Sequence, residues 1–246
     1  MDEIMQGGVP QRPPVGGTGP IELLTRGFSR VREQYWLWVG VCFVAFLLAA
    51  LVPFYILLGP AVIGVASMFR RQDRGLPLEF GQMFRGFDYF TQSLPAALLL
   101  MASTLLLAAV VYVPAMIVLF ATMSANDGEP AAIAVVGIIL AALFMMVASF
   151  VIQSGFTLSF PLVFDRDLAG MKAVREGWKA FLANKGTVLL YGLVAGVAVM
   201  IGALACYVGV IFVLPIVAGG HWELYRSLYP ELATRDEHGE WPGETV

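Results

Sequence analysis

Four long apolar blocks without a charged residue set the pattern of the chain. They are Tyr35–Phe69, Ser93–Asn126, Ala131–Phe164 and Gly186–Gly220. Each block exceeds the roughly 20 apolar residues that cross a bilayer as an α-helix. The pattern therefore predicts an all-α protein, a polytopic transmembrane helical bundle whose outer surface faces lipid.

The distribution of Lys and Arg between the blocks indicates how often the chain crosses the membrane. Among the long connections, only 122–130 contains no Lys or Arg. Because cytosolic loops carry an excess of basic residues, we expect this segment alone to lie outside. The second and third blocks then cross once each, and the first and fourth enter and leave on the cytosolic side as hairpins. About six membrane segments result, with both termini in the cytosol.

The blocks 35–69 and 186–220 each admit a second interpretation. Pro53 lies just past the middle of the first block and favours a break in the helix there. Small residues near the middle of the fourth block, such as Ala203 and Gly209, would permit a tight turn. The two halves of each block are close to the shortest helix that spans a bilayer. A single kinked helix in each block is therefore the alternative to a hairpin.

Three of the predicted membrane segments run outward from the cytosolic side. Each is preceded by a short amphipathic stretch in which a glycine is followed by an aromatic residue. We define the first interfacial segment by Gly27 and Phe28, the second by Gly86, Phe87 and Phe90, and the third by Gly177, Trp178 and Phe181. In each stretch, apolar residues recur at spacings of three and four beside basic residues, as in helices that lie in the headgroup layer. We therefore expect three amphipathic interfacial helices.

The recurrence of these segments suggests one unit used three times, over 21–70, 77–164 and 168–228 of a transmembrane domain that spans 21–229. The alternative is that glycine–aromatic pairs recur by chance at membrane boundaries, where aromatic residues are enriched. Residues 1–20 are rich in proline and glycine and predict a disordered cytosolic tail. Residues 230–246 predict an acidic cytosolic tail.

Composition narrows the classes of function. The chain is 59% hydrophobic and 13% charged, and no basic patch indicates a nucleic-acid partner. None of the four blocks contains Asp, Glu, Lys, Arg or His, the residues that usually relay protons or perform catalysis within a membrane. The two histidines lie at or beyond the end of the last block. We therefore expect no enzyme, no catalytic residue, no metal site and no cofactor.

A few polar or small residues within the blocks are candidates for a binding or packing role. Four polar residues share one helical stretch of the third block: Ser149, Gln153, Ser154 and Thr157. They could line a cavity, or they could bond to a neighbouring helix. Gly192 and Gly196 form a GxxxG pair that permits close helix approach. The run Asp165-Arg166-Asp167 directly follows the third block, and we expect it to form a hydrated elbow or an N-cap for the third interfacial segment.

Several short motifs lie in order between about Trp36 and Tyr229. The clearest are Gly59-Pro60 with Gly64, then Met83-Phe84-Arg85-Gly86-Phe87, and then Phe160-Pro161-Leu162-Val163-Phe164-Asp165. In these motifs the chain resembles a broad group of bacterial predicted integral membrane proteins of unknown function. The resemblance implies a multi-helix bundle in a bacterial cytoplasmic (inner) membrane, and it implies no activity at particular positions.

These patterns favour a non-enzymatic membrane scaffold or accessory subunit. Its partners would be membrane lipid and either another protein or further copies of the chain. The alternative function is that of a carrier for lipid or another apolar small molecule. An uncharged cavity, lined by the polar stretch around Gln153, would suit such a cargo.

Overall fold

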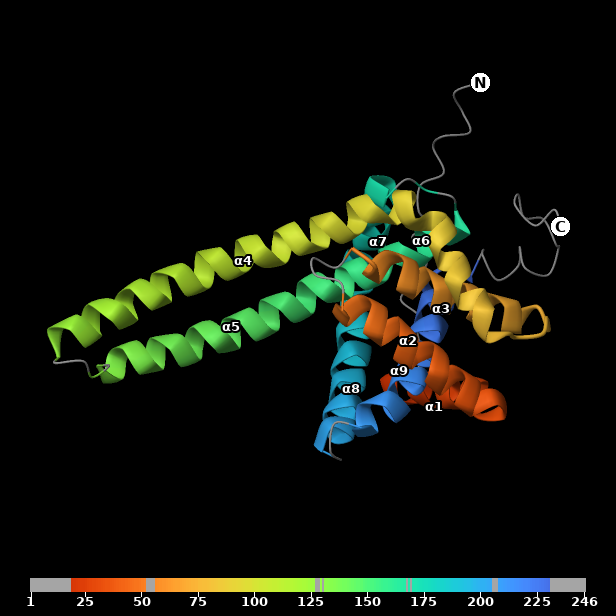
Figure 1. Ribbon diagram of the computed structural model, residues 1–246, viewed down its shortest axis with the longest axis horizontal. Helices are drawn as coiled ribbons and strands as arrows, with labels where there is room; N and C mark the ends of the chain where they lie inside the picture. Colours follow the sequence, from red (N-terminus) through yellow and green to blue (C-terminus); the bar gives the residue numbers. More distant parts are fainter. Residues whose placement is uncertain are drawn as a thin grey trace, which may run out of the picture. The chain divides into compact units, whose positions relative to one another are not determined.

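A computed structural model describes residues 19–51, 56–126, 129, 131–166, 168, 170–204 and 208–230. The helices are α1 (Pro20–Val31), η2 (Arg32–Gln34), α2 (Tyr35–Leu51), α3 (Leu58–Asp73), η4 (Phe80–Tyr89), α4 (Phe90–Ala125), α5 (Ala132–Thr157), α6 (Ser159–Asp165), α7 (Gly170–Ala183), α8 (Lys185–Leu204) and α9 (Val208–Leu228), as Figure 1 shows. No strand occurs in this part of the chain. The prediction of an all-α membrane fold is confirmed.

Five helical runs are long and apolar enough to cross a membrane. They are Pro20–Ala50, Phe80–Ala125, Ala132–Asp165, Lys185–Leu204 and Val208–Leu228. The predicted sixth segment is α3, whose 16 residues rise only about 24 Å. That length falls short of the roughly 30 Å hydrocarbon core. The predicted count of about six segments is therefore approximate.

The first and fourth apolar blocks each contain two helices that pack side by side. In the first block α2 packs against α3, and in the fourth block α8 packs against α9. Both pairs have the arrangement of a hairpin. Pro53, which favours a break in the first block, lies outside the described ranges, as do residues 205–207 of the fourth block.

The end of α3 shows how local sequence fixes a helix boundary. Gly75 has a φ of +66°, a left-handed conformation that glycine adopts without steric strain. The amide of Gly75 donates to the carbonyl of Gln72, and the amide of Leu76 donates to that of Arg71, each at 3.0 Å. These two bonds form a Schellman motif, which satisfies carbonyls that would otherwise be left over at the helix end.

The chain forms two compact units. One combines the residues up to Glu33 with those from Leu182 onward, and the other comprises Gln34–Phe181. In the first unit α1 packs mainly against α9 and also touches α8. In the second, α3 packs against η4, and both contact α2 and α4. The repeat boundaries expected from the sequence cut across these two units.

The central part of the second unit is a long hairpin of α4 and α5 (Figure 1). α4 has 36 residues and α5 has 26. The buried residues of α4 all lie in its first three turns and end with Leu100. Beyond that point α4 packs along α5 without burying a single residue fully.

Candidate functional site

The first interfacial segment packs through its glycine. Leu23, Gly27 and Val31, spaced by four, form the buried face of α1. A Cβ atom on Gly27 would collide with the backbone nitrogen of Gly220 in α9 and would lie 2.6 Å from the carbonyl oxygen of Ile216. The aromatic side chain of Phe28 is 47% exposed. The glycine therefore makes the helix contact, and the aromatic residue points outward.

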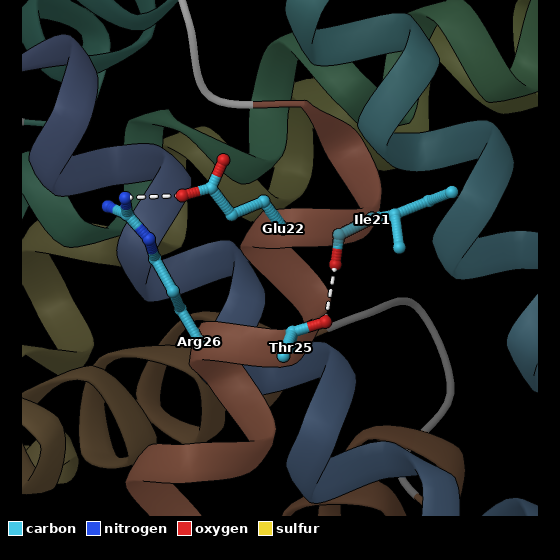
Figure 2. Close-up of polar contacts among 4 residues, drawn as sticks. All are labelled: Ile21, Glu22, Thr25 and Arg26. Carbon is cyan, nitrogen blue, oxygen red and sulfur yellow. Dashed lines mark hydrogen bonds and ion pairs between the residues drawn. The ribbon is translucent and has the colours of Figure 1, made fainter.

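The outer face of α1 carries charged and polar side chains. Arg26 forms an ion pair with Glu22 at 2.6 Å, and the hydroxyl of Thr25 donates to the carbonyl of Ile21 at 3.0 Å (Figure 2). Ile21 itself is 70% exposed. Because the Arg26–Glu22 pair is exposed, it contributes little to stability. α1 therefore presents the mixed surface that suits a headgroup layer.

The second interfacial segment, in η4, meets α3 in the same way. Gly86 is buried, and a Cβ atom there would collide with the carbonyl oxygen of Pro60 and lie 2.6 Å from the backbone nitrogen of Gly64. Gly64 in turn faces the carbonyl of Met83. Phe87 is half-buried, as is Phe90 at the start of α4. Two glycines thus allow the backbones of α3 and η4 to touch.

The third interfacial segment, in α7, packs on the junction of α5 and α6. A Cβ atom on Gly177 would collide with the hydroxyl of Ser159 and lie 3.0 Å from its backbone nitrogen. The half-buried ring of Trp178 lies over Gly155, where a Cβ atom would come within 2.8 Å of it. Phe181 is buried, with its ring 5.4 Å from that of Trp178.

The first two contacts share a register. Gly27 and Gly86 each meet two residues that are four positions apart on the facing helix, one helical turn. The pairs are Ile216 and Gly220, and Pro60 and Gly64; Gly177 instead meets Ser159, and its neighbour Trp178 meets Gly155. Gly86 packs on α3 and Gly177 on α6, which precede them in the chain, and Gly27 packs on α9. The sequence pattern pointed to both the glycines and the aromatic residues, but it did not predict that the glycines contact a second helix.

The polar stretch of α5 does not converge on one point. The hydroxyls of Ser154 and Thr157 donate to the carbonyls of Phe150 and Gln153 in their own helix, each at 2.8 Å. Ser149 is half-buried, whereas Gln153 is exposed. The Gln153 amide forms no hydrogen bond within the described ranges. Gln153 is therefore the one member of this stretch that presents an unused polar group outward.

The two glycines of the GxxxG pair in α8 differ in burial. Gly192 is half-buried. Gly196 is exposed, and a Cβ atom there would meet nothing within 4 Å. Close packing at Gly196 is therefore not used by the described part of this chain.

A buried ion pair joins the ends of α3 and α6. Arg70 and Asp165 lie 2.8 Å apart, with side chains only 6% and 4% exposed. The guanidinium of Arg70 also lies over the ring of Phe164, 4.7 Å from its centre. The expectation that Asp165 lies in a hydrated elbow is wrong, because a carboxylate with so strong a partner tolerates burial. Arg70 directly follows the first apolar block and Asp165 directly follows the third. This placement of opposite charges is the sequence signal that could have indicated the ion pair.

Polar contacts in the first unit connect α9 to α1 and α8. Glu223 of α9 forms an ion pair with Arg30 of α1. Tyr191 of α8 is fully buried, and its hydroxyl donates to the carbonyl of Val217 at 2.7 Å. His221 stacks edge to face on the same tyrosine, 4.8 Å between ring centres. These residues hold α1, α8 and α9 together.

Within the described residues, no group of three or more His, Cys, Asp or Glu side chains could hold a metal ion. Comparison with known protein families, with curated proteins and with solved structures finds no match for the chain. The resemblance to bacterial membrane proteins therefore stays a prediction.

Proposed function

We propose that the chain is a non-enzymatic scaffold or accessory subunit of a bacterial inner membrane, with a protein partner on the tip of its central hairpin. The observation that supports the proposal is the length of the α4–α5 hairpin together with its exposed apolar surface. A membrane enzyme or pump would be expected to enclose polar groups. This hairpin instead presents mainly apolar side chains outward along its length.

The hairpin is longer than the membrane is thick. The 36 residues of α4 rise about 54 Å, and the 34 residues from Ala132 to Asp165 rise about 51 Å. Transmembrane helices tilt by up to about 40°, so that a core of about 30 Å accommodates a helix of roughly 39 Å. About ten residues of α4 therefore extend beyond the hydrocarbon core.

The part that extends beyond the core is apolar. At this end of the hairpin Ile117 is 63% exposed, Phe120 is 60% exposed and Ile133 is 77% exposed. Lipid tails do not cover side chains outside the core, and exposed apolar patches in water mark sites of protein interaction. A partner protein that covers the tip would shield these apolar side chains from water.

Site-specific photo-crosslinking in intact cells tests the proposal. A photoreactive amino acid at Phe120, about 45 Å along α4 from Phe90, should give a reproducible protein adduct. The matched control is Leu106, which is 67% exposed on the same helix but lies only about 24 Å from Phe90, within the core. It should give no protein adduct at the same position on a gel. Absence of any protein adduct from Phe120 would refute the tip partner.

We also propose cytosolic termini, on the strength of the Lys and Arg distribution. The test uses single cysteines in a chain whose two native cysteines are replaced by alanine. A cysteine at Ser124, near the tip, should react with a membrane-impermeant maleimide added to spheroplasts. A cysteine at Gly81 in η4 should react only after permeabilisation, and the reverse pattern would invert the topology.

The carrier hypothesis ranks second. It needs a polar lining for an enclosed cargo, yet the hydroxyls of Ser154 and Thr157 already bond within α5. The amide of Gln153 points to the outside of the hairpin.

A further inference from the structure

A regular stripe of side chains runs along the outside of α5. Its members are spaced four, three, four, three and four residues apart and end at the amide of Gln153. They are Val135, Ile139, Ala142, Met146, Ser149 and Gln153. All are exposed except Ser149, which is half-buried. We call these six residues the α5 stripe.

The stripe is distinct from the face that α5 turns toward α4. The face toward α4 consists of buried and half-buried residues, each one position before a member of the α5 stripe. They are Ala134, Ile138, Ala141, Met145, Ala148 and Ile152. Because one residue corresponds to about 100° of rotation, the stripe flanks this contact and stays uncovered. A repeat of this kind suits a second helix that crosses at a small left-handed angle.

Gln153 makes the stripe unsuitable for lipid alone. It lies 12 residues before Asp165, about 18 Å along the helix and so near the middle of a core of about 30 Å. An amide without a hydrogen-bond partner is strongly disfavoured in hydrocarbon. A glutamine in a membrane helix avoids this energetic cost when its amide forms a hydrogen bond to a neighbouring helix.

We propose that the α5 stripe is the contact between two copies of this chain. Copies inserted with the same topology hold their α5 helices parallel, so a twofold axis along the membrane normal brings Gln153 opposite Gln153 at one depth. An amide carries both donors and an acceptor. Two such side chains therefore satisfy each other, whereas a different protein would need its own polar residue at that depth.

The small residues of the stripe fit this geometry. Ala142 and Ser149 are seven residues apart, two helical turns, and they alternate with the longer Ile139, Met146 and Gln153. Small residues at an interface allow helix backbones to approach closely in a membrane. The inference rests on α5 crossing the membrane, as proposed above, and does not depend on what covers the hairpin tip.

Disulfide trapping in lipid tests the contact. The full chain, with its native cysteines replaced by alanine, is placed in phosphatidylethanolamine and phosphatidylglycerol vesicles and oxidised. Ser149→Cys should form a covalent dimer. Phe144→Cys is the matched control, since Phe144 is 57% exposed but lies about half a turn around the helix from Gln153. It should yield at least fivefold less dimer.

Adding Gln153→Leu to Ser149→Cys isolates the role of the amide. Dimer yield should fall at least fivefold at high lipid dilution, whereas Gln153→Asn should retain most of it. No dimer from Ser149→Cys, equal yields from Phe144→Cys, or a yield that Gln153→Leu leaves unchanged would each overturn the inference. Thermal unfolding of each variant establishes that it is folded. The Phe120 adduct should be unaffected by Gln153→Leu, so the two proposals fail separately.

Discussion

The replacement of Gly86 by alanine tests whether the interfacial segments are held by backbone contact. The added Cβ atom would lie 2.6 Å from the backbone nitrogen of Gly64 and 2.9 Å from its Cα, and it would collide with the carbonyl of Pro60. All of these neighbours are backbone atoms of α3, which cannot rotate away. The segment η4 as a whole must therefore move.

The size of the effect follows from the displacement. Carbon contacts are most favourable at about 3.5 Å or more, so η4 must withdraw from α3 by roughly 1 Å, which forfeits up to about half of their dispersion attraction. Overpacking of this kind costs about 1–3 kcal/mol. We expect the upper end for Gly86→Ala, about 3 kcal/mol, because no side chain can yield.

The assay is thermal unfolding of the purified chain in lipid nanodiscs, followed by tryptophan fluorescence. For a chain of this size 1 kcal/mol corresponds to about 2–4 °C, so Gly86→Ala should lower the Tm by roughly 6–12 °C. The matched control is Gly81→Ala in the same segment, where a Cβ atom would meet nothing within 4 Å. Its Tm should be unchanged or slightly raised. If the two variants unfold within 2 °C of each other, the backbone contact does not hold η4.

Two further predictions concern the polar contacts between helices. Asp165→Asn should destabilise the chain by about 3 kcal/mol, because the buried guanidinium of Arg70 then loses the carboxylate that lies 2.8 Å from it, and the double variant Arg70→Met/Asp165→Leu should be less destabilised than this single variant. The same unfolding assay measures both, and a double variant worse than Asp165→Asn would contradict this account of the pair. Tyr191→Phe removes the hydroxyl that donates to Val217 and should cost about 1 kcal/mol, measured as a fall of about 2–4 °C in the Tm; an unchanged Tm would show that the bond contributes nothing.

The membrane helices could be predicted from the sequence because their signal is local. About 34 consecutive residues without charge leave a helix in lipid as the simplest structure. The limits of α3 were harder to predict, because Phe69 ends an apolar block while the helix continues to Asp73. Whether a charged residue at such an end is hydrated or buried depends on a partner elsewhere in the chain.

The candidate site shows the same limit more clearly. Arg70 meets Asp165 across 95 residues, and no local pattern reports such a pairing. Periodicity placed Phe28 on the apolar face of the first interfacial segment, whereas the contact with a second helix is made by its neighbour Gly27. A glycine has no side chain to count in a hydrophobic pattern, and its value is visible only when a second backbone lies against it.

The pairing of α1 with α9 has a consequence for biogenesis. Arg30 and Glu223 are separated by 193 residues, and ribosomes synthesise about 5–20 residues per second. α1 therefore waits roughly 10–40 s before its packing partner exists. We expect its two-faced surface, with Arg26 outward and Leu23 and Gly27 inward, to let α1 rest on the membrane surface during that interval. α9 then closes the unit on α1, so premature termination of translation leaves α1 with its glycine face uncovered.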